Sequence, residues 1–465
     1  CDSASDLASL MRRALVLLFA CACSDPAPAG PSFVPGTVFA TSAALNRGLL
    51  DRRGLIHAHS IYSHDACDGM PEVNGVRDEV CFEDFRRGLC QVGHDFVMLT
   101  DHRESFSDTA FPETLLYRPM RGDRLVERNG EPTASWAGCP DGRVALIMAG
   151  TEAATMPVGL EHHVSDRETR SEIYGAVTST AIERLKGAGA VSLLQHTEDW
   201  TIQQLTELPI DGFEMFNLHA NSFLHLGEIL EIVLLLQGET APVGLPAPDL
   251  TVISFISEDP RYLEAWGSVL SSGVKRVTTM GTDCHRNSFP AKLADGERID
   301  SYRRMMGWFS NHVLVRPETD GTWDDRHLKE GLRAGRLYGA FEVYGYPVGF
   351  DYHATVGARV EEMGAQIALS DAPKLFVKRP TMEGLSSTGA QPEITLRVLR
   401  AIDAGWEEIG VATSGDLEVT PTKPGAYRAE VRIRPRHLLP YLGKAAAQLA
   451  ESDKVWIYAN AIYLR

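Results

Sequence analysis

The chain carries closely spaced histidines of the kind that bind metal ions. His57 and His59 follow a short apolar run, and His64 lies five positions after the second of them. In a strand, residues i and i+2 point the same way, so the first two imidazoles can converge on one metal ion. Further groups that bind metals or move protons end later apolar runs: Asp101-His102, Glu152, His196, Glu214 with Asn217, and Asp283-Cys284-His285. This recurrence predicts one shared metal site.

These groups need a scaffold that brings strand ends together. From about Asn46 onward, short apolar runs alternate with helix-like segments, a pattern typical of an α/β fold with parallel strands. In such folds, functional groups gather at the carboxyl ends of the strands. The predicted strands are Gly54–Ser60, Phe96–Thr100, Val144–Ala149, Val191–Gln195, Gly212–Asn217 and Arg276–Gly281. The predicted helices between them include Phe82–Gln91, Ser179–Ala188 and Leu224–Gln237.

In their order, several motifs resemble those of the PHP (polymerase and histidinol phosphatase) superfamily. They are His57-Ala58-His59-Ser60, Thr100-Asp101-His102, Gly150-Thr151-Glu152, His196 and Gly281-Thr282-Asp283-Cys284-His285. The resemblance implies a distorted (β/α)7 barrel, which we expect over residues 48–345, holding two or three divalent metal ions. With its β-rich C-terminal part, the chain looks most like the carbaryl-hydrolase-like group of that superfamily.

The resemblance also implies ligands for each metal ion. Position by position, the first metal would be held by His57, His59 and Asp283. Glu152 would bridge the first and second metals, and His163 and His196 would complete the second. The third metal would be held by His64, His102 and His285. Nitrogen and carboxylate ligands without thiolates suit Zn²⁺, Mn²⁺ or Fe²⁺. Two choices stay open: Asp65 can take the place of His64, and His162 stands next to the favoured His163.

A site of this composition predicts a hydrolase. Paired metals can share a water molecule, lower its pKa and hold the resulting hydroxide for attack, with Glu152, Asp283 and His285 as the catalytic residues. We expect a small-molecule ester as substrate, with a phosphate mono-, di- or triester favoured. A carboxylic ester or carbamate is the alternative on the same metals. A non-catalytic metal- or ligand-binding lipoprotein is the alternative from another class.

Residues that follow the motifs are candidates for the wall of the substrate site. Arg103 and Arg286 suit a phosphate oxygen, and Trp200 suits an apolar wall. Each of them also fits a simple structural role, as a solvated charge or a packing residue. His219 follows a strand end and is a further candidate for the pocket.

Composition and the first residues bear on location. With 465 residues, 44% of them hydrophobic, the chain can form two or three domains, and its net charge of −17 argues against a nucleic-acid partner. Residues 1–23 resemble a bacterial lipoprotein leader, with Arg12-Arg13, an apolar run and Cys21 or Cys23 as the lipidated residue; a plain secretion signal is the alternative. We therefore expect an exported protein, periplasmic or anchored to the membrane only by an N-terminal lipid.

The remaining sequence predicts a linker and a second domain. Residues 24–47 are rich in Pro, Ala and Gly and are expected to form a linker. Export permits disulfides, and Cys67 with Cys81 is the first pair to test, whereas Cys284 is expected in the core. Residues 346–465 are expected to form a β-sandwich-like domain, because Glu393–Ala401, Ala404–Ala412, Gly425–Arg434 and Val455–Leu464 alternate apolar and polar residues.

Overall fold

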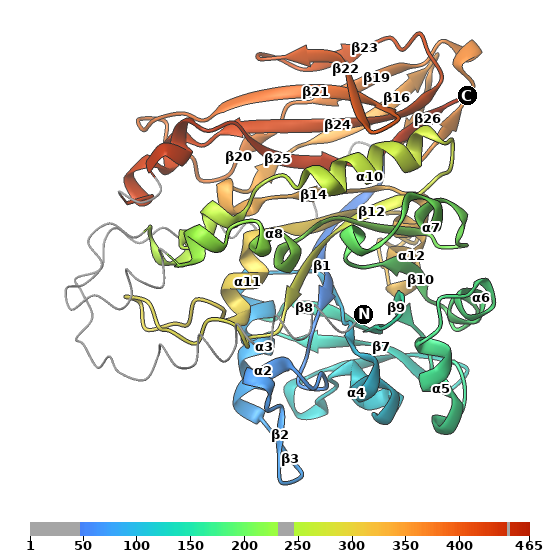
Figure 1. Ribbon diagram of the computed structural model, residues 1–465, viewed down its shortest axis with the longest axis vertical. Helices are drawn as coiled ribbons and strands as arrows, with labels where there is room; N and C mark the ends of the chain where they lie inside the picture. Colours follow the sequence, from blue (N-terminus) through green and yellow to red (C-terminus); the bar gives the residue numbers. More distant parts are fainter. Residues whose placement is uncertain (1–46, 231–245, 444–446) are drawn as a thin grey trace.

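The computed structural model describes residues 47–230, 246–443 and 447–465. The predicted leader at residues 1–23, nearly all of the predicted linker and the second half of the predicted helix Leu224–Gln237 lie outside these ranges. The described chain is a mixed α/β structure, in which a closed barrel forms the lower part of Figure 1 and further sheets form the upper part.

Seven strands close the barrel, the number that the family resemblance implied. They are β1 (Leu50–Ala58), β4 (Phe96–Met98), β8 (Val144–Glu152), β9 (Met156–Leu160), β10 (Val191–Leu194), β11 (Gly212–Asn217) and β12 (Val277–Cys284). Each strand pairs with the next in this order, and β12 returns to β1. All of these pairings are parallel except those of β9, which runs antiparallel to β8 and β10.

Helices separate most barrel strands, but the alternation is irregular. The main ones are α3 (Glu79–Val92), α4 (Arg103–Asp108), α5 (Arg167–Tyr174), α6 (Ser179–Gly187), α7 (Ile202–Glu207), α8 (Leu218–Phe223) and α10 (Pro260–Ser271). Two further helices, α11 (Tyr302–Trp308) and α12 (Asp325–Ala334), follow the last barrel strand. A hairpin of β6 (Arg124–Arg128) and β7 (Glu131–Gly138) also stands between β4 and β8, and only residues 153–155 join β8 to β9. This short link makes β9 antiparallel, because a parallel strand needs a longer crossover.

Local sequence explains these elements. Asp78 and Thr178 accept hydrogen bonds from Cys81 N and Ala181 N, so they cap the amino ends of α3 and α6. Neighbouring barrel residues such as Leu193 and Leu194 belong to two different apolar clusters. This is expected of strands buried on both faces, whose residues alternate between the barrel interior and the helix layer.

The C-terminal part is β-rich, as predicted, and its main sheet continues from the barrel. The strands β13 (Ser310–Val315), β14 (Leu337–Ala340), β25 (Lys454–Ala459), β24 (Gly425–Arg434), β21 (Glu393–Ile402) and β22 (Gly405–Ala412) pair in this order, and β13 pairs with β1. A four-stranded sheet of β17 (Arg359–Glu362), β16 (Asp351–Val356), β19 (Lys374–Lys378) and β23 (Leu417–Val419) lies beside it.

Helix α10 joins the two parts. A Cβ atom on Gly267 would lie 2.1 Å from the Gly405 carbonyl oxygen, so glycine permits the close approach of α10 to β22. Trp266 of α10 meets Trp406 edge to face, and the buried Arg428 guanidinium lies over both rings. Aromatic and cation–π contacts therefore fix the helix to the sheet.

Two disulfides link the first third of the barrel. Cys67 pairs with Cys81, as predicted, and Cys90 pairs with Cys139. Cys284 is buried and free, which confirms its place in the core. Among the described residues, no helix has both the length and the apolar character needed to cross a membrane.

Candidate metal centre

The predicted strand ends meet at one rim of the barrel. His57 and His59 come from the end of β1, Glu152 from the end of β8, His196 from the residues after β10, and Asp283 from β12. The side chains of His57, His59 and Asp283 are at most 2% exposed, whereas that of His196 is 26% exposed. The cluster therefore has a buried base and an open side.

Two carboxylates stand between the histidines. Asp283 Oδ1 lies 3.2 Å from Nε2 of both His57 and His59. Glu152 Oε2 lies 3.5 Å and 3.3 Å from the same two nitrogens. The second oxygens, Glu152 Oε1 and Asp283 Oδ2, face His196 Nε2 at 3.1 Å and 3.5 Å. Each carboxylate therefore contacts the pair His57 and His59 with one oxygen and His196 with the other. The sequence predicted only Glu152 as a bridge between metals.

The donor atoms fit a metal ion better than they fit one another. His57 Nε2, His59 Nε2 and Asp283 Oδ1 are buried and have no hydrogen-bond partner. Two ligands that each lie about 2.1 Å from one tetrahedral metal are separated by about 3.4 Å, close to the distances seen here. Because unpaired buried polar atoms are costly, their convergence indicates that these residues could hold a metal ion.

A second group of ligands uses Asp65, the alternative to His64. Asp65 Oδ2 lies 3.0 Å from His285 Nε2 and 3.1 Å from His102 Nε2. His64 is exposed, and its ring is tilted against that of His102 with ring centroids 5.0 Å apart. The turn after β1 directs the shorter Asp65 inward, where Ser63 Oγ donates a hydrogen bond to its Oδ1. The structure therefore replaces His64 by Asp65 in this group.

His163 does not join the cluster. Its Nδ1 lies 3.0 Å from the Tyr174 hydroxyl and its Nε2 lies 2.9 Å from the Thr109 carbonyl oxygen, so both nitrogens already have partners. Burial lowers the pKa of this ring to about 4. The strand direction explains the difference, because β9 is antiparallel and the chain leaves it beside Ala188, at the end of α6 and before β10 begins. His162 is exposed and makes no contact with the cluster.

His219 occupies the rim instead. It lies in the first turn of α8, directly after β11, and its Nδ1 is 3.0 Å from Asp283 Oδ2. Its ring stacks on that of His285, with centroids 5.1 Å apart. His219, Asp283 and His285 form a further group that could hold a metal. In the sequence, the position of His219 directly after a strand end indicated its place at the pocket.

Burial and charge act against each other in the cluster. Burial lowers the pKa of His57, but the charges of Asp283, Glu214 and Glu152 outweigh it and hold that pKa well above the usual value. Burial raises the pKa of Asp283, yet the charges of His219, His57 and His285 hold it well below the ordinary range. The metal-free cluster therefore keeps the Asp283 carboxylate ionised and a proton on His57, and metal binding must displace that proton.

Glu214 orients the ligands from behind. Its Oε1 lies 2.7 Å from His57 Nδ1, and its Oε2 accepts hydrogen bonds from His196 N and Asn217 Nδ2. Gly281 makes room for this carboxylate, since a Cβ there would lie 1.9 Å from Oε1. Glu214 thus directs His57 Nε2 toward the metal position, as second-layer carboxylates do in metal sites.

Replacing Glu214 with Gln is expected to weaken metal binding by about 10- to 100-fold. The amide keeps the shape of the side chain but removes the charge that holds the His57 ring. Competition with a chromophoric chelator measures the affinity. As a matched control, Glu207→Gln on α7 should leave the affinity unchanged, and an unaltered affinity in the Glu214 variant would contradict the orienting role.

Asp65→Ala and His64→Ala are expected to differ although the residues are neighbours. Asp65 contacts two histidines of the cluster, so its removal should lower the number of bound metal ions by one. His64 is exposed, so its removal should leave the metal count unchanged. Elemental analysis of both variants after identical metal loading gives the counts, and the reverse pattern would restore His64 as the ligand.

The Cys67–Cys81 disulfide fixes the turn that carries Asp65. Cys67 N donates to the His285 carbonyl oxygen and has a φ of 56°, so the turn is strained and tied to the cluster. Cys81 belongs to the first turn of α3, which anchors the other end of the bond.

Loss of this disulfide is expected to lower metal content as well as stability. The 14-residue separation of Cys67 and Cys81 and the 49-residue separation of Cys90 and Cys139 correspond to stabilisation of about 3 and about 4 kcal/mol, respectively, by loop-closure entropy. Cys90→Ser/Cys139→Ser should therefore destabilise at least as much as Cys67→Ser/Cys81→Ser. Only the latter pair should lose metal at the Asp65 group. Equal metal contents in the two variants, measured by elemental analysis, would contradict this role.

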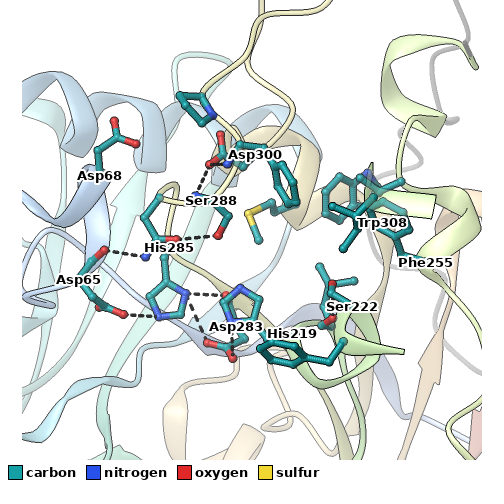
Figure 2. A pocket seen from close by; sticks show the side chains of 18 of the residues that line it. Asp65, Asp68, His219, Ser222, Phe255, Asp283, His285, Ser288, Asp300 and Trp308 are labelled. Carbon is teal, nitrogen blue, oxygen red and sulfur yellow. Dashed lines mark hydrogen bonds and ion pairs between the residues drawn. The ribbon is translucent and has the colours of Figure 1, made fainter. Parts of the chain in front are cut away.

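A cavity of about 670 Å³ opens beside the cluster, and it differs from the predicted substrate wall. None of Arg103, Trp200 and Arg286 lines it. Arg103 pairs with Glu104, Arg286 pairs with Asp84, and the Trp200 indole donates to the Gln195 carbonyl oxygen. Figure 2 shows Asp65, His285, Asp283 and His219 on one side of the cavity and Trp308 and Phe255 on the other.

The site therefore consists of buried histidine and carboxylate groups that could hold metal ions at the edge of a cavity. No family model, no curated protein and no solved structure matches the chain significantly, so a functional assignment rests on the chemistry of these residues.

Proposed function

We propose that the protein is an exported, metal-dependent hydrolase of small esters, a phosphoesterase in the first place. We further propose that its barrel is the distorted (β/α)7 barrel of the PHP superfamily, of the carbaryl-hydrolase-like group. One observation carries the proposal: the buried, unpartnered atoms His57 Nε2, His59 Nε2 and Asp283 Oδ1 converge beside a cavity that can admit a substrate.

Divalent metals held here would lower the pKa of a bound water and polarise the ester oxygen. The residues of the chain supply the geometry. Glu152 and Asp283 set the spacing between the pair His57 and His59 on one side and His196 on the other. Glu214 orients His57. The reaction adds water across the ester: its oxygen bonds to phosphorus or carbonyl carbon, the bond to the leaving oxygen breaks, and that oxygen takes a proton.

The lining of the cavity supports a second candidate substrate on the same site. Among the described residues, no lysine or arginine lines the cavity. A phosphate monoester dianion would then rely on the metals alone for charge neutralisation, whereas a carboxylic ester or carbamate carries no charge to neutralise. Carboxylic ester or carbamate hydrolysis therefore stands as the second candidate.

A panel of p-nitrophenyl substrates tests the proposal. Phosphate mono-, di- and triesters, an acetate and a carbamate release the same chromophore, so rates of metal-loaded protein can be compared directly. Turnover of a phosphate ester that disappears with chelator supports the phosphoesterase. Turnover of only the acetate and carbamate would overturn it in favour of the second candidate, and no turnover by fully metallated protein would overturn the hydrolase itself.

The two disulfides support the proposed export of the protein. Disulfides persist in oxidising compartments and are rare in the cytosol of most organisms. The two disulfides of the barrel agree with the lipoprotein-like leader that the sequence predicts. We propose a periplasmic or lipid-anchored protein, and labelling of intact cells with a membrane-impermeant reagent tests the location. Failure to label under conditions that label a known exported protein would contradict it.

A further inference from the structure

The cavity beside the metal cluster is polar at one side only. Apolar side chains form the opposite wall, and they come from α8, the segment before α10, the loop after β12, and α11: Phe223, Ile229, Phe255, Phe289, Met305 and Trp308. The volume of about 670 Å³ lies within the range of sites that enclose a small organic molecule. The cavity therefore has room for a group well beyond the reacting atoms.

Several of these wall residues are held in place by the core. Phe255, Met305 and Trp308 are at most 5% exposed. The Trp308 indole nitrogen donates to the Asp249 carbonyl oxygen at 3.2 Å, which satisfies its only polar atom and leaves the ring to the apolar wall. This part of the wall is consequently preformed and needs no rearrangement to receive an apolar group.

The polar atoms next to this wall are already engaged within the protein. Asn287 Nδ2 donates to the Asp65 carbonyl oxygen, and Ser222 Oγ donates to the Leu218 carbonyl oxygen. Asp300 accepts hydrogen bonds from Ser288 N and Phe289 N and pairs with Arg298. With no lysine or arginine among the described lining residues, the wall offers no cationic side chain to bind a second phosphate.

We infer that the substrate is an ester with a bulky, uncharged apolar group that occupies this wall while the ester lies at the metals. The inference rests on the proposed hydrolase and specifies its substrate class. Burial of the apolar group supplies binding free energy through its removal from water, and the fixed position of the wall relative to His219 and Asp283 aligns the ester. We expect nucleotides and sugar phosphates to be poor substrates.

Matched substrates that differ in one apolar group test the inference. Methyl and phenyl p-nitrophenyl phosphate carry the same charge and leaving group, as do p-nitrophenyl acetate and benzoate. Each kcat/KM is divided by the rate constant for hydroxide-catalysed hydrolysis, so intrinsic reactivity cancels. In the series that turns over, we expect the larger substrate to be favoured by about 10- to 100-fold. Equal or lower values for the larger substrate overturn the inference.

Substitutions at the outer edge of the wall identify its location. Phe223 and Leu226 line the cavity yet are 52% and 44% exposed, so Phe223→Ser/Leu226→Ser should fold normally. We expect this variant to lower the preference for the larger substrate by at least about 5-fold. Met120→Ser/Val411→Ser replaces exposed apolar residues far from the lining and should leave the preference unchanged. An unchanged preference in the first variant overturns the placement.

A binding measurement separates this inference from the proposed hydrolase. N-phenyl-1-naphthylamine is neutral and fluoresces in apolar sites, and we expect one molecule to bind per chain, with weaker binding in Phe223→Ser/Leu226→Ser. Turnover without a size preference overturns the apolar-group inference and leaves the hydrolase intact. If no ester turns over in metal-loaded protein, the proposed hydrolase function is wrong, and binding of the probe then tests the apolar wall by itself. Site-specific binding supports an apolar ligand at this wall, and absence of binding overturns the apolar-group inference.

Discussion

Asp283→Ala is expected to reduce kcat/KM for ester hydrolysis by at least about 1,000-fold, because several kcal/mol of metal-based stabilisation of the transition state are lost. The residue contacts five histidines through its two oxygens: Oδ1 faces His57, His59 and His285, and Oδ2 faces His196 and His219. Glu152 also spans the buried base and the open side, but of the two carboxylates only Asp283 contacts His219. Its loss should therefore lower metal content as well as rate.

The same substitution has a second expected effect, on the metal-free protein. The Asp283 carboxylate helps to hold the pKa of buried His57 and His59 high, so its removal leaves the protonated rings with one carboxylate partner fewer. Asp283→Asn keeps the shape and separates lost charge from lost packing. Asp108→Ala, on an exposed carboxylate at the end of α4, is the matched control. Normal metal content and activity in Asp283→Ala, with folding checked by circular dichroism, would contradict the ligand assignment.

Glu152→Ala is expected to abolish activity to a similar extent but with a different loss of metal. Its Oε2 faces the buried pair His57 and His59 and also lies 3.5 Å from His102 Nδ1, while Oε1 faces His196. It therefore contacts His59 and His102 of the group that contains Asp65, whereas Asp283 contacts His59 and His285 of that group. We expect at least one metal ion to be lost per chain.

Comparison of conservative variants tests the bridging role of Glu152. Glu152→Asp keeps the charge but shortens the reach from the pair His57 and His59 to His196, so it should retain metal better than Glu152→Ala while remaining poorly active. Glu104→Ala removes an exposed carboxylate near the same rim and should change neither quantity. Full activity in Glu152→Asp would show that the spacing set by this residue does not matter, contrary to the account given above.

Much of the barrel was predictable because hydrophobic periodicity and position along a strand determine it. The six predicted strands all form, and His57, His59, Glu152, His196, Asp283 and His285 come together because parallel strands end at one rim. The error at His163 had a physical cause. Sequence alone does not show that β9 runs antiparallel, and this direction takes the chain away from the cluster.

Other features depend on contacts between distant segments. The choice of Asp65 over His64 follows from a turn that is held by the Cys67 disulfide and by backbone hydrogen bonds to His285 and Arg286, just after β12. The His57–Glu214 contact needs the missing side chain of Gly281. The apolar wall is assembled from Phe255, Trp308 and residues of α8, whose separate sequences look like ordinary core. None of these can be derived from local pattern, since each depends on the packing of whole elements.

The most direct test of the account is elemental analysis of the purified chain after loading with Zn²⁺ or Mn²⁺ and removal of unbound metal. The account predicts at least two tightly held metal ions per chain, the number that a two-metal hydrolytic site requires. It also predicts that Asp283→Ala and Glu152→Ala lose metal while their exposed controls do not. A folded chain that holds no metal after loading, or whose metal content is indifferent to both substitutions, would contradict the central claim.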